Sequence, residues 1–184
     1  MIIALVKKEM IHFFHLLQPT IARPLLVKFE DEGGILPIHN TGFWVSGGDI
    51  GSIGFGYDFA IANGLGHASI SGDEDENKSL TLGAHIKPVD NLEVGVSAYF
   101  DELDPGAETL AGTTTTQSLT NQMLVGHLAY LSPTFETIAE YHSISNDIGN
   151  TTSTTSAYFV YLGYNIKKIT PYVRYDNIDY EDTE

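Results

Sequence analysis

The sequence contains one dense group of acidic side chains whose spacing could bind a metal ion. The group consists of Asp73, Glu74, Asp75 and Glu76. It begins like a helix-loop-helix calcium site, which needs glycine at its sixth position and glutamate at its twelfth. Those positions hold Lys78 and Ala84, so the motif fails. The segment is interpreted as a solvated loop in which a divalent cation would bind only incidentally, and neither a metal site nor a cofactor is expected.

Histidines supply the other candidates for chemistry. His12 and His15 have a spacing that suits metal binding on a helix, but no carboxylate partner is fixed near them. His142 and Ser143 are adjacent, so on a strand they point to opposite sides and cannot act as base and nucleophile. The chain also lacks a GxSxG elbow and a GxGxxG loop. We therefore do not expect an enzyme.

Composition excludes several classes of partner. The 184 residues contain 9 Lys and Arg against 24 Asp and Glu, a formal charge of −15, and no cysteine. Such a charge argues against nucleic acid and against adhesion to anionic lipid. No apolar run is long enough to span a membrane as a helix, but a membrane β-barrel stays possible, because its alternating strands do not stand out in hydropathy averages.

A regular alternation of apolar and polar residues is the main structural signal. In 78–101 two alternating runs flank the short segment 88–91, a pattern typical of a β-hairpin. Similar runs occur elsewhere, and the predicted strands are 41–47, 52–62, 78–87, 92–101, 120–131, 134–143, 156–166 and 169–179. Long polar connections (63–77, 102–119, 145–155) alternate with short ones (88–91, 132–133, 167–168).

This alternation predicts an all-β fold: an antiparallel up-and-down meander of about eight strands that forms part of a transmembrane β-barrel, with short turns at one rim and long loops at the other. Aromatic residues near the strand ends fit the girdles of such a barrel, although aromatics are common in strands generally. Residues 1–24 are expected to be irregular and 25–184 to be the barrel segment. Both ends look like cuts, so we expect a fragment of a longer protein.

Three segments resemble a known family: FEDEGGILPIHNTGFWVSG (29–47), LSPTFETIAEYHS (131–143) and YFVYLGYNIKKITPYVRYDNI (158–178). They are similar to bacterial outer-membrane porins of the phosphate-selective-porin-like, sixteen-stranded type. The resemblance implies a barrel in contact with outer-membrane lipid, a homotrimer as the full-length parent, and passive diffusion of small polar solutes or ions.

Strand alternation assigns nine residues to the lumen of such a barrel: Asp58, His85, Glu93, Tyr99, Glu136, Glu140, Tyr172, Arg174 and Asp176. Carboxylates outnumber basic residues among them, which favours cations. Arg174 would either create a field across the pore or neutralise neighbouring acids. The alternative is a soluble antiparallel β-sandwich or barrel that acts as a surface ligand-binding module, since a soluble core also demands one apolar side per strand.

Overall fold

The computed structural model describes residues 41–64, 75–109 and 112–181, which form one sheet of eight strands. The strands are β1 (Gly42–Ile50), β2 (Phe55–Ala62), β3 (Ser79–Val89), β4 (Leu92–Leu103), β5 (Leu119–Leu131), β6 (Phe135–Ile148), β7 (Thr151–Tyr164) and β8 (Tyr172–Asp179). The predicted residues 1–24, His12, His15, Asp73 and Glu74 lie outside the described part. No helix in the described ranges is long and apolar enough to cross a membrane.

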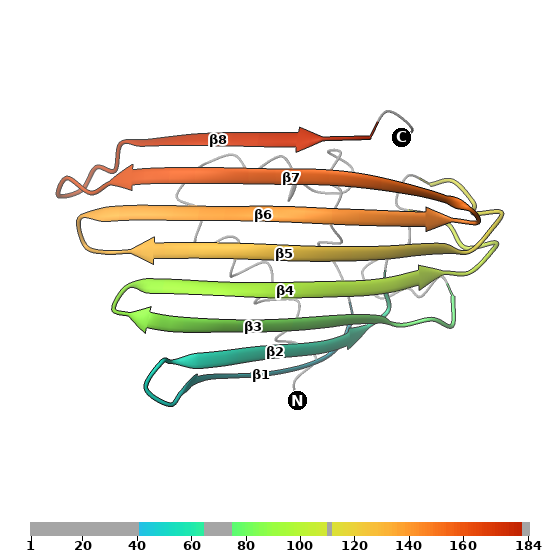
Figure 1. The fold of residues 1–184 in the computed structure, drawn as a ribbon, viewed down its shortest axis with the longest axis horizontal. Coiled ribbons are helices and arrows are strands. Elements are labelled where there is room, and N and C mark those ends of the chain that lie inside the picture. Colours follow the sequence, from blue (N-terminus) through green and yellow to red (C-terminus); the bar gives the residue numbers. More distant parts are fainter. Residues whose placement is uncertain (1–40, 65–74, 110–111, 182–184) are drawn as a thin grey trace.

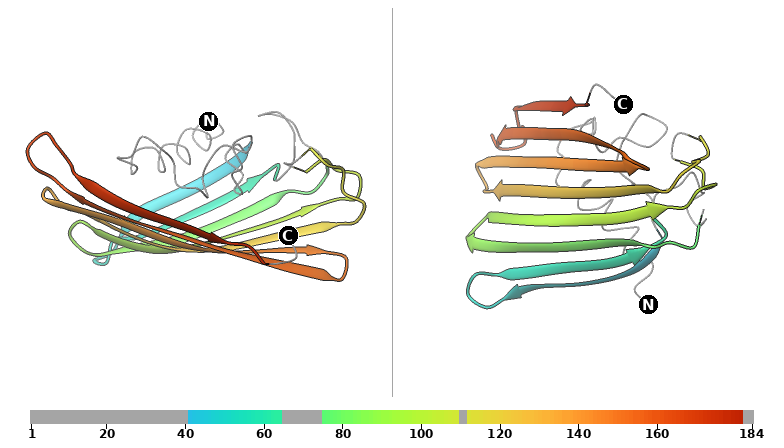
Figure 2. Two further views of the ribbon diagram at one scale, coloured as in Figure 1. Left: turned by 90° about the horizontal axis from the view of Figure 1, so that it is seen from above. Right: turned by 45° about the vertical axis from the view of Figure 1, so that its right-hand side comes forward.

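Each strand pairs antiparallel with the next one along the chain, from β1 at one edge to β8 at the other (Figure 1). The sheet is twisted and curved (Figure 2), as strands built from L-residues require. The predicted all-β meander is confirmed, and all eight predicted strands are present. Within the described residues, β1 and β8 do not pair with each other, so the sheet has two open edges.

The connections match the prediction except at one hairpin. The links β1–β2, β3–β4, β5–β6 and β7–β8 lie together at what we call the short-turn rim (Figure 1). The predicted long connection 145–155 is wrong, because β6 and β7 extend through it and pair up to Ile148 and Thr151. Threonine favours strands, and Gly149 with φ 60° opens a two-residue turn of the kind that joins long hairpins.

The β3–β4 hairpin shows how the chain reverses at the short-turn rim. Between Ile86 and Val89 the register shifts, so Lys87 and Pro88 form an irregularity in β3. Proline cannot donate a ladder hydrogen bond, and such an irregularity is where a strand tolerates it. Asn91 then adopts φ 66°, a left-handed conformation that asparagine accepts better than most residues.

The two faces of the sheet differ sharply. On the apolar face, side chains such as Phe59, Leu82, Val96 and Leu124 are exposed. On the other face, which we call the polar face, many residues are buried. Two clusters of buried residues lie there: Tyr99, Met123, Ile144 and Ala157, and Ile138, Phe159 and Tyr161. The buried part of the molecule is therefore on the polar face, where the predicted site residues also lie.

Candidate functional site

All nine residues predicted to line a lumen lie on the polar face. Strand pairing decides this, because residues paired across the sheet point to the same side. His85 pairs with Gly95, which pairs with His127, which in turn pairs with Glu140. The same row continues through Phe159 to Asp176. We call such a row of paired residues one level of the sheet. Each level contains one residue from each strand that the row crosses.

Eight carboxylate, histidine and arginine side chains occupy three adjacent levels of the polar face, which also hold Tyr161, and we call these eight residues the ionisable belt. The belt consists of Asp58, His85, Glu93, His127, Glu140, His142, Arg174 and Asp176. The prediction omitted His127 and gave His142 no role in a lumen. Both alternate with the apolar positions of their strands, so the signal that identified the other belt residues was present for them too. Tyr99, Glu136 and Tyr172 share the face but lie outside the belt.

Every carboxylate of the belt has a neighbour that can carry positive charge. Two of these ion pairs join neighbouring strands: Nδ1 of His85 lies 4.0 Å from Oδ2 of Asp58, and Nε2 of His127 lies 3.6 Å from Oε1 of Glu93.

The other two pairs lie within one strand. Nε2 of His142 lies 3.0 Å from Oε2 of Glu140, and Nε of Arg174 donates to Oδ2 of Asp176 at 2.8 Å. The contact of Arg174 is the one expected if this residue neutralises an adjacent acid.

Glycines make room for two of the imidazole rings. A Cβ added at Gly56 would overlap the ring of His85, and one added at Gly95 would lie 2.5 Å from Cε1 of His127. It would also lie 2.8 Å from the carbonyl oxygen of Ala84. The two histidines therefore lie across the backbone of a neighbouring strand, a position that any larger residue at the glycine would block.

Polar residues on either side of the belt are held by direct hydrogen bonds. The hydroxyl of Tyr99 donates to Asp101 at 2.8 Å, and that of Tyr161 donates to Glu136 at 3.2 Å. The indole of Trp44 donates to Asp58 at 3.1 Å. These contacts fix the side chains that flank the belt, so the polar face presents an ordered set of acceptors and donors.

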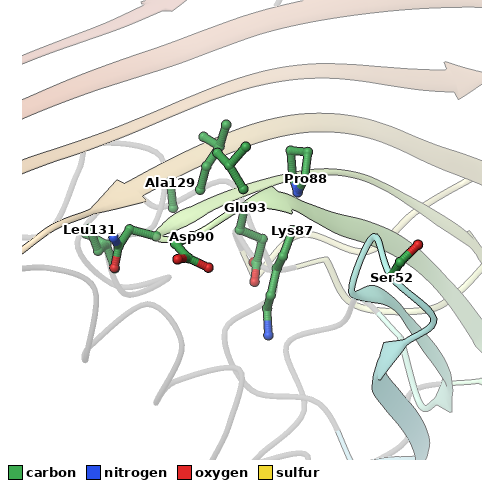
Figure 3. Close-up of a pocket in the computed structure, with 10 residues that line it drawn as sticks. Ser52, Lys87, Pro88, Asp90, Glu93, Ala129 and Leu131 are labelled. Carbon is green, nitrogen blue, oxygen red and sulfur yellow. The ribbon is translucent and has the colours of Figure 1, made fainter.

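A pocket of about 440 Å³ opens beside the belt at the short-turn rim. Figure 3 shows Lys87 and Glu93 in its wall, pointing to the same side of the sheet, with Ala129 and Leu131 beyond them. Nζ of Lys87 lies 2.9 Å from Oδ1 of Asp49. That contact lowers the pKa of the Asp49 carboxyl and raises the pKa of Lys87. The pocket wall therefore contains Lys87, which pairs with Asp49 at the short-turn rim, and Glu93, which belongs to the belt.

The apolar face carries a mainly aliphatic band between two borders of aromatic residues; in β2, Tyr57 and Phe59 lie inside the band. The border toward the long connections contains Phe43, Phe100, Tyr141, Tyr158 and Tyr175. The border toward the short turns contains Phe55, Tyr130, Phe135 and Tyr164. Rings meet within each border: Tyr158 and Tyr175 have centroids 5.9 Å apart, and Tyr130 and Phe135 6.5 Å. Outer-membrane barrels carry girdles of aromatic residues at both membrane–water interfaces.

The band runs obliquely across the strands. The level of Tyr175 in β8, followed through the pairings to β3, reaches Ile86, whereas the border in β3 lies six residues further on, at Leu80, and stays on that level through Ile61 to Phe43 in β1. Six residues over the seven strand steps from β8 to β1 is about 3 Å per step, against a strand spacing of about 4.8 Å. The slope of this border is therefore about 30°, somewhat below the tilt of about 35–45° of strands in outer-membrane barrels.

Asp75, in the described half of the acidic loop, accepts hydrogen bonds from the backbone of two other residues. Oδ1 of Asp75 accepts a hydrogen bond from the backbone of Asn77 at 3.0 Å, and Oδ2 accepts one from Asp104 at 2.9 Å. Asp75 thus ties the β2–β3 connection to the end of β4. Among the residues that the structure covers, no cluster of three or more His, Asp or Glu is arranged to hold a metal ion.

No protein-family model matches the chain, and neither a curated protein nor a solved structure matches it.

Proposed function

We propose that this protein forms part of the wall of a β-barrel pore in the bacterial outer membrane, through which small polar solutes or ions diffuse passively. The apolar face contacts lipid and the polar face lines an aqueous path. The observation that carries the proposal is the oblique aliphatic band with aromatic borders. The band in β4, from Leu92 to Phe100, spans about 27 Å along the strand, or about 23 Å after tilting, near the height of about 25 Å typical of such barrels.

Water is a poor solvent for this apolar face. Phe43, Val96 and Leu124 are 67%, 58% and 61% exposed, and they belong to one continuous surface over all the strands. Soluble monomers rarely expose an apolar patch that extends over a whole sheet. Lipid chains cover such a surface without a protein partner, which is why the membrane is the simplest environment for it.

A membrane also places a demand on the edges of the sheet. Unpaired backbone groups at β1 and β8 are costly in hydrocarbon, so in the membrane both edges must pair with further strands, such as those of a second copy of this chain. The porin resemblance supplies the corresponding proposal, a closed barrel that assembles as a homotrimer.

The ionisable belt suggests which solutes pass. Its four carboxylates face one permanently charged cation, Arg174. A path with this balance attracts cations and repels anions, because charged residues lining a pore act at short range. We propose that small cations are favoured.

The two buried clusters on the polar face favour a second candidate. Tyr99, Met123, Ile144 and Ala157 pack as residues of a protein core do. A soluble β-sandwich or barrel that binds a ligand at its surface would use such a core. In that protein the apolar face would be covered by a partner rather than by lipid.

Cysteine labelling separates the two candidates, because the chain has no native cysteine. Val96 and Ser97 are neighbours in β4 that point to opposite faces. After refolding of the full chain into phospholipid vesicles, a charged maleimide should label Ser97→Cys and leave Val96→Cys unlabelled until detergent is added. Thr154→Cys is the control, since Thr154 lies on the same face as Val96 but beyond the aromatic border, and it should react.

Equal labelling of Val96→Cys and Thr154→Cys in vesicles would overturn the proposal. So would a folded protein that stays in the aqueous fraction, and that result would favour the soluble ligand-binding module.

A further inference from the structure

We propose that His85 and His127 make the charge of the ionisable belt, and with it the preference for cations, depend on pH. This inference rests on the proposed function, since it concerns the polar face as a lining of the aqueous path. It predicts strong cation preference in neutral and alkaline conditions and a weaker preference in acid.

The two histidines are placed to act on the path. Their side chains are 21% and 19% exposed, whereas His142 is 1% exposed beside Glu140. Histidine is the side chain that ordinarily changes charge between pH 5 and 8. The side chains of His85 and His127 are therefore more accessible than that of His142, although Nε2 of His127 itself is buried, and charge on these rings acts on the space above the polar face.

The charged groups around His127 come from both neighbouring strands. On β4, Glu93 places a carboxylate oxygen 3.6 Å from its Nε2. On β6, Glu140 is its direct pairing partner, and His142 lies one level away on the same face. Two acids thus flank this imidazole among the described residues, and a proton gained there cancels charge where the belt is most acidic.

His85 has a similar setting. Asp58 on β2 lies 4.0 Å away, and Glu93 lies on the same face of β4 one level along. Lys87 on its own strand and Asp49 near the short-turn rim carry opposite charges that offset each other at 2.9 Å. The charge that remains near His85 is negative.

The net charge of the belt shows how large the effect of protonation would be. With neutral histidines, four carboxylates and Arg174 leave three net negative charges. Protonation of His85 and His127 leaves one. The rings lie over Gly56 and Gly95, which leave room for them, so the change of charge occurs at these two positions along the path.

The test uses Ser97→Cys as a local probe of potential. Ser97 lies one level from both histidines, on β4 between their strands. The full chain in vesicles is reacted with a cationic and with an anionic methanethiosulfonate at pH 8 and pH 5.5. The ratio of the two rates cancels the reactivity of the thiol itself and reports the charge around it.

The ratio of cationic to anionic rate should fall about tenfold from pH 8 to pH 5.5. Two charges at roughly 7–10 Å, screened over about 10 Å and acting oppositely on the two reagents, give an effect of this order. In the His85→Gln/His127→Gln background the ratio should stay flat. Lys87→Gln is the control, because it should raise the ratio equally at both pH values.

Each result has one meaning. A ratio that does not change with pH, or that changes equally in the double variant, overturns this inference and leaves the pore proposal standing. Failure of both reagents to label Ser97→Cys in vesicles shows that the polar face is not lined by water and overturns both.

Discussion

Replacing Val96 with arginine tests whether the apolar face contacts lipid. Val96 is 58% exposed at the middle of the band, between Ala84 on β3 and Gly126 on β5. An arginine facing lipid at the bilayer midplane costs about 2–4 kcal/mol in membrane barrels. The same substitution on a water-exposed surface usually changes stability by less than about 0.5 kcal/mol. Val96→Arg should therefore lower the folding equilibrium constant at least roughly 30-fold in vesicles.

The chain provides its own reporter for this measurement. Trp44 is its only tryptophan, and its indole donates to Asp58 at 3.1 Å, so its fluorescence should change when the β1–β2 pairing is lost. Urea unfolding of vesicle-bound protein gives the difference in free energy between variant and wild type. Thr154→Arg is the matched control, because Thr154 is exposed on the same face beyond Tyr158 and should cost almost nothing. Equal costs at Val96 and Thr154 would refute the lipid assignment.

Two further substitutions test local geometry. Gly95→Ala should destabilise the fold by about 1–3 kcal/mol, because its methyl group meets the ring of His127 and a backbone carbonyl, whereas Gly126→Ala, with open space around it, should be nearly neutral in the same urea assay. A neutral Gly95→Ala would show that the ring is not held against the strand. Lys167→Gly should stabilise the β7–β8 turn by about 1 kcal/mol, because Lys167 has φ 58°, and Lys168→Gly should give no gain. If both lysine variants behave alike in thermal unfolding, the left-handed turn is wrong.

Alternation alone was enough to find the strands. A side-chain period of two is a local property, so the runs around Phe59 and Val96 could be read without knowing which strands pair. The hairpin tip at Gly149 could not be read this way. There the segment is rich in Ser, Thr and Asn on both faces, a composition shared by loops and by strands that leave the apolar band.

Which residues of the belt lie beside one another depends on the register between strands. Strand alternation in the sequence does not determine that register. The pairing of Glu93 with Ala129, one level from His127, follows from where β4 and β5 meet across a long connection. Alternation placed Glu93 on the correct face but could not place His127 beside it. The sequence also could not show that glycines lie opposite the imidazoles, because Gly95 is a cross-strand neighbour of His127 and not a sequence neighbour.

The distribution of aromatic residues argues for lipid over a second protein layer. In a packed sandwich, the bulky rings contribute most when they lie at the centre of the interface, where the most area leaves water. Here the centre of the band holds mainly small and aliphatic residues such as Ala84, Val96 and Leu124, the exceptions being Tyr57 and Phe59 in β2, and the other rings lie at the two borders. A tyrosine at a border can bury its ring in hydrocarbon and keep its hydroxyl in water, as Tyr158 and Tyr164 would at the two borders of the band in β7. A membrane favours that arrangement, and a protein partner does not call for it.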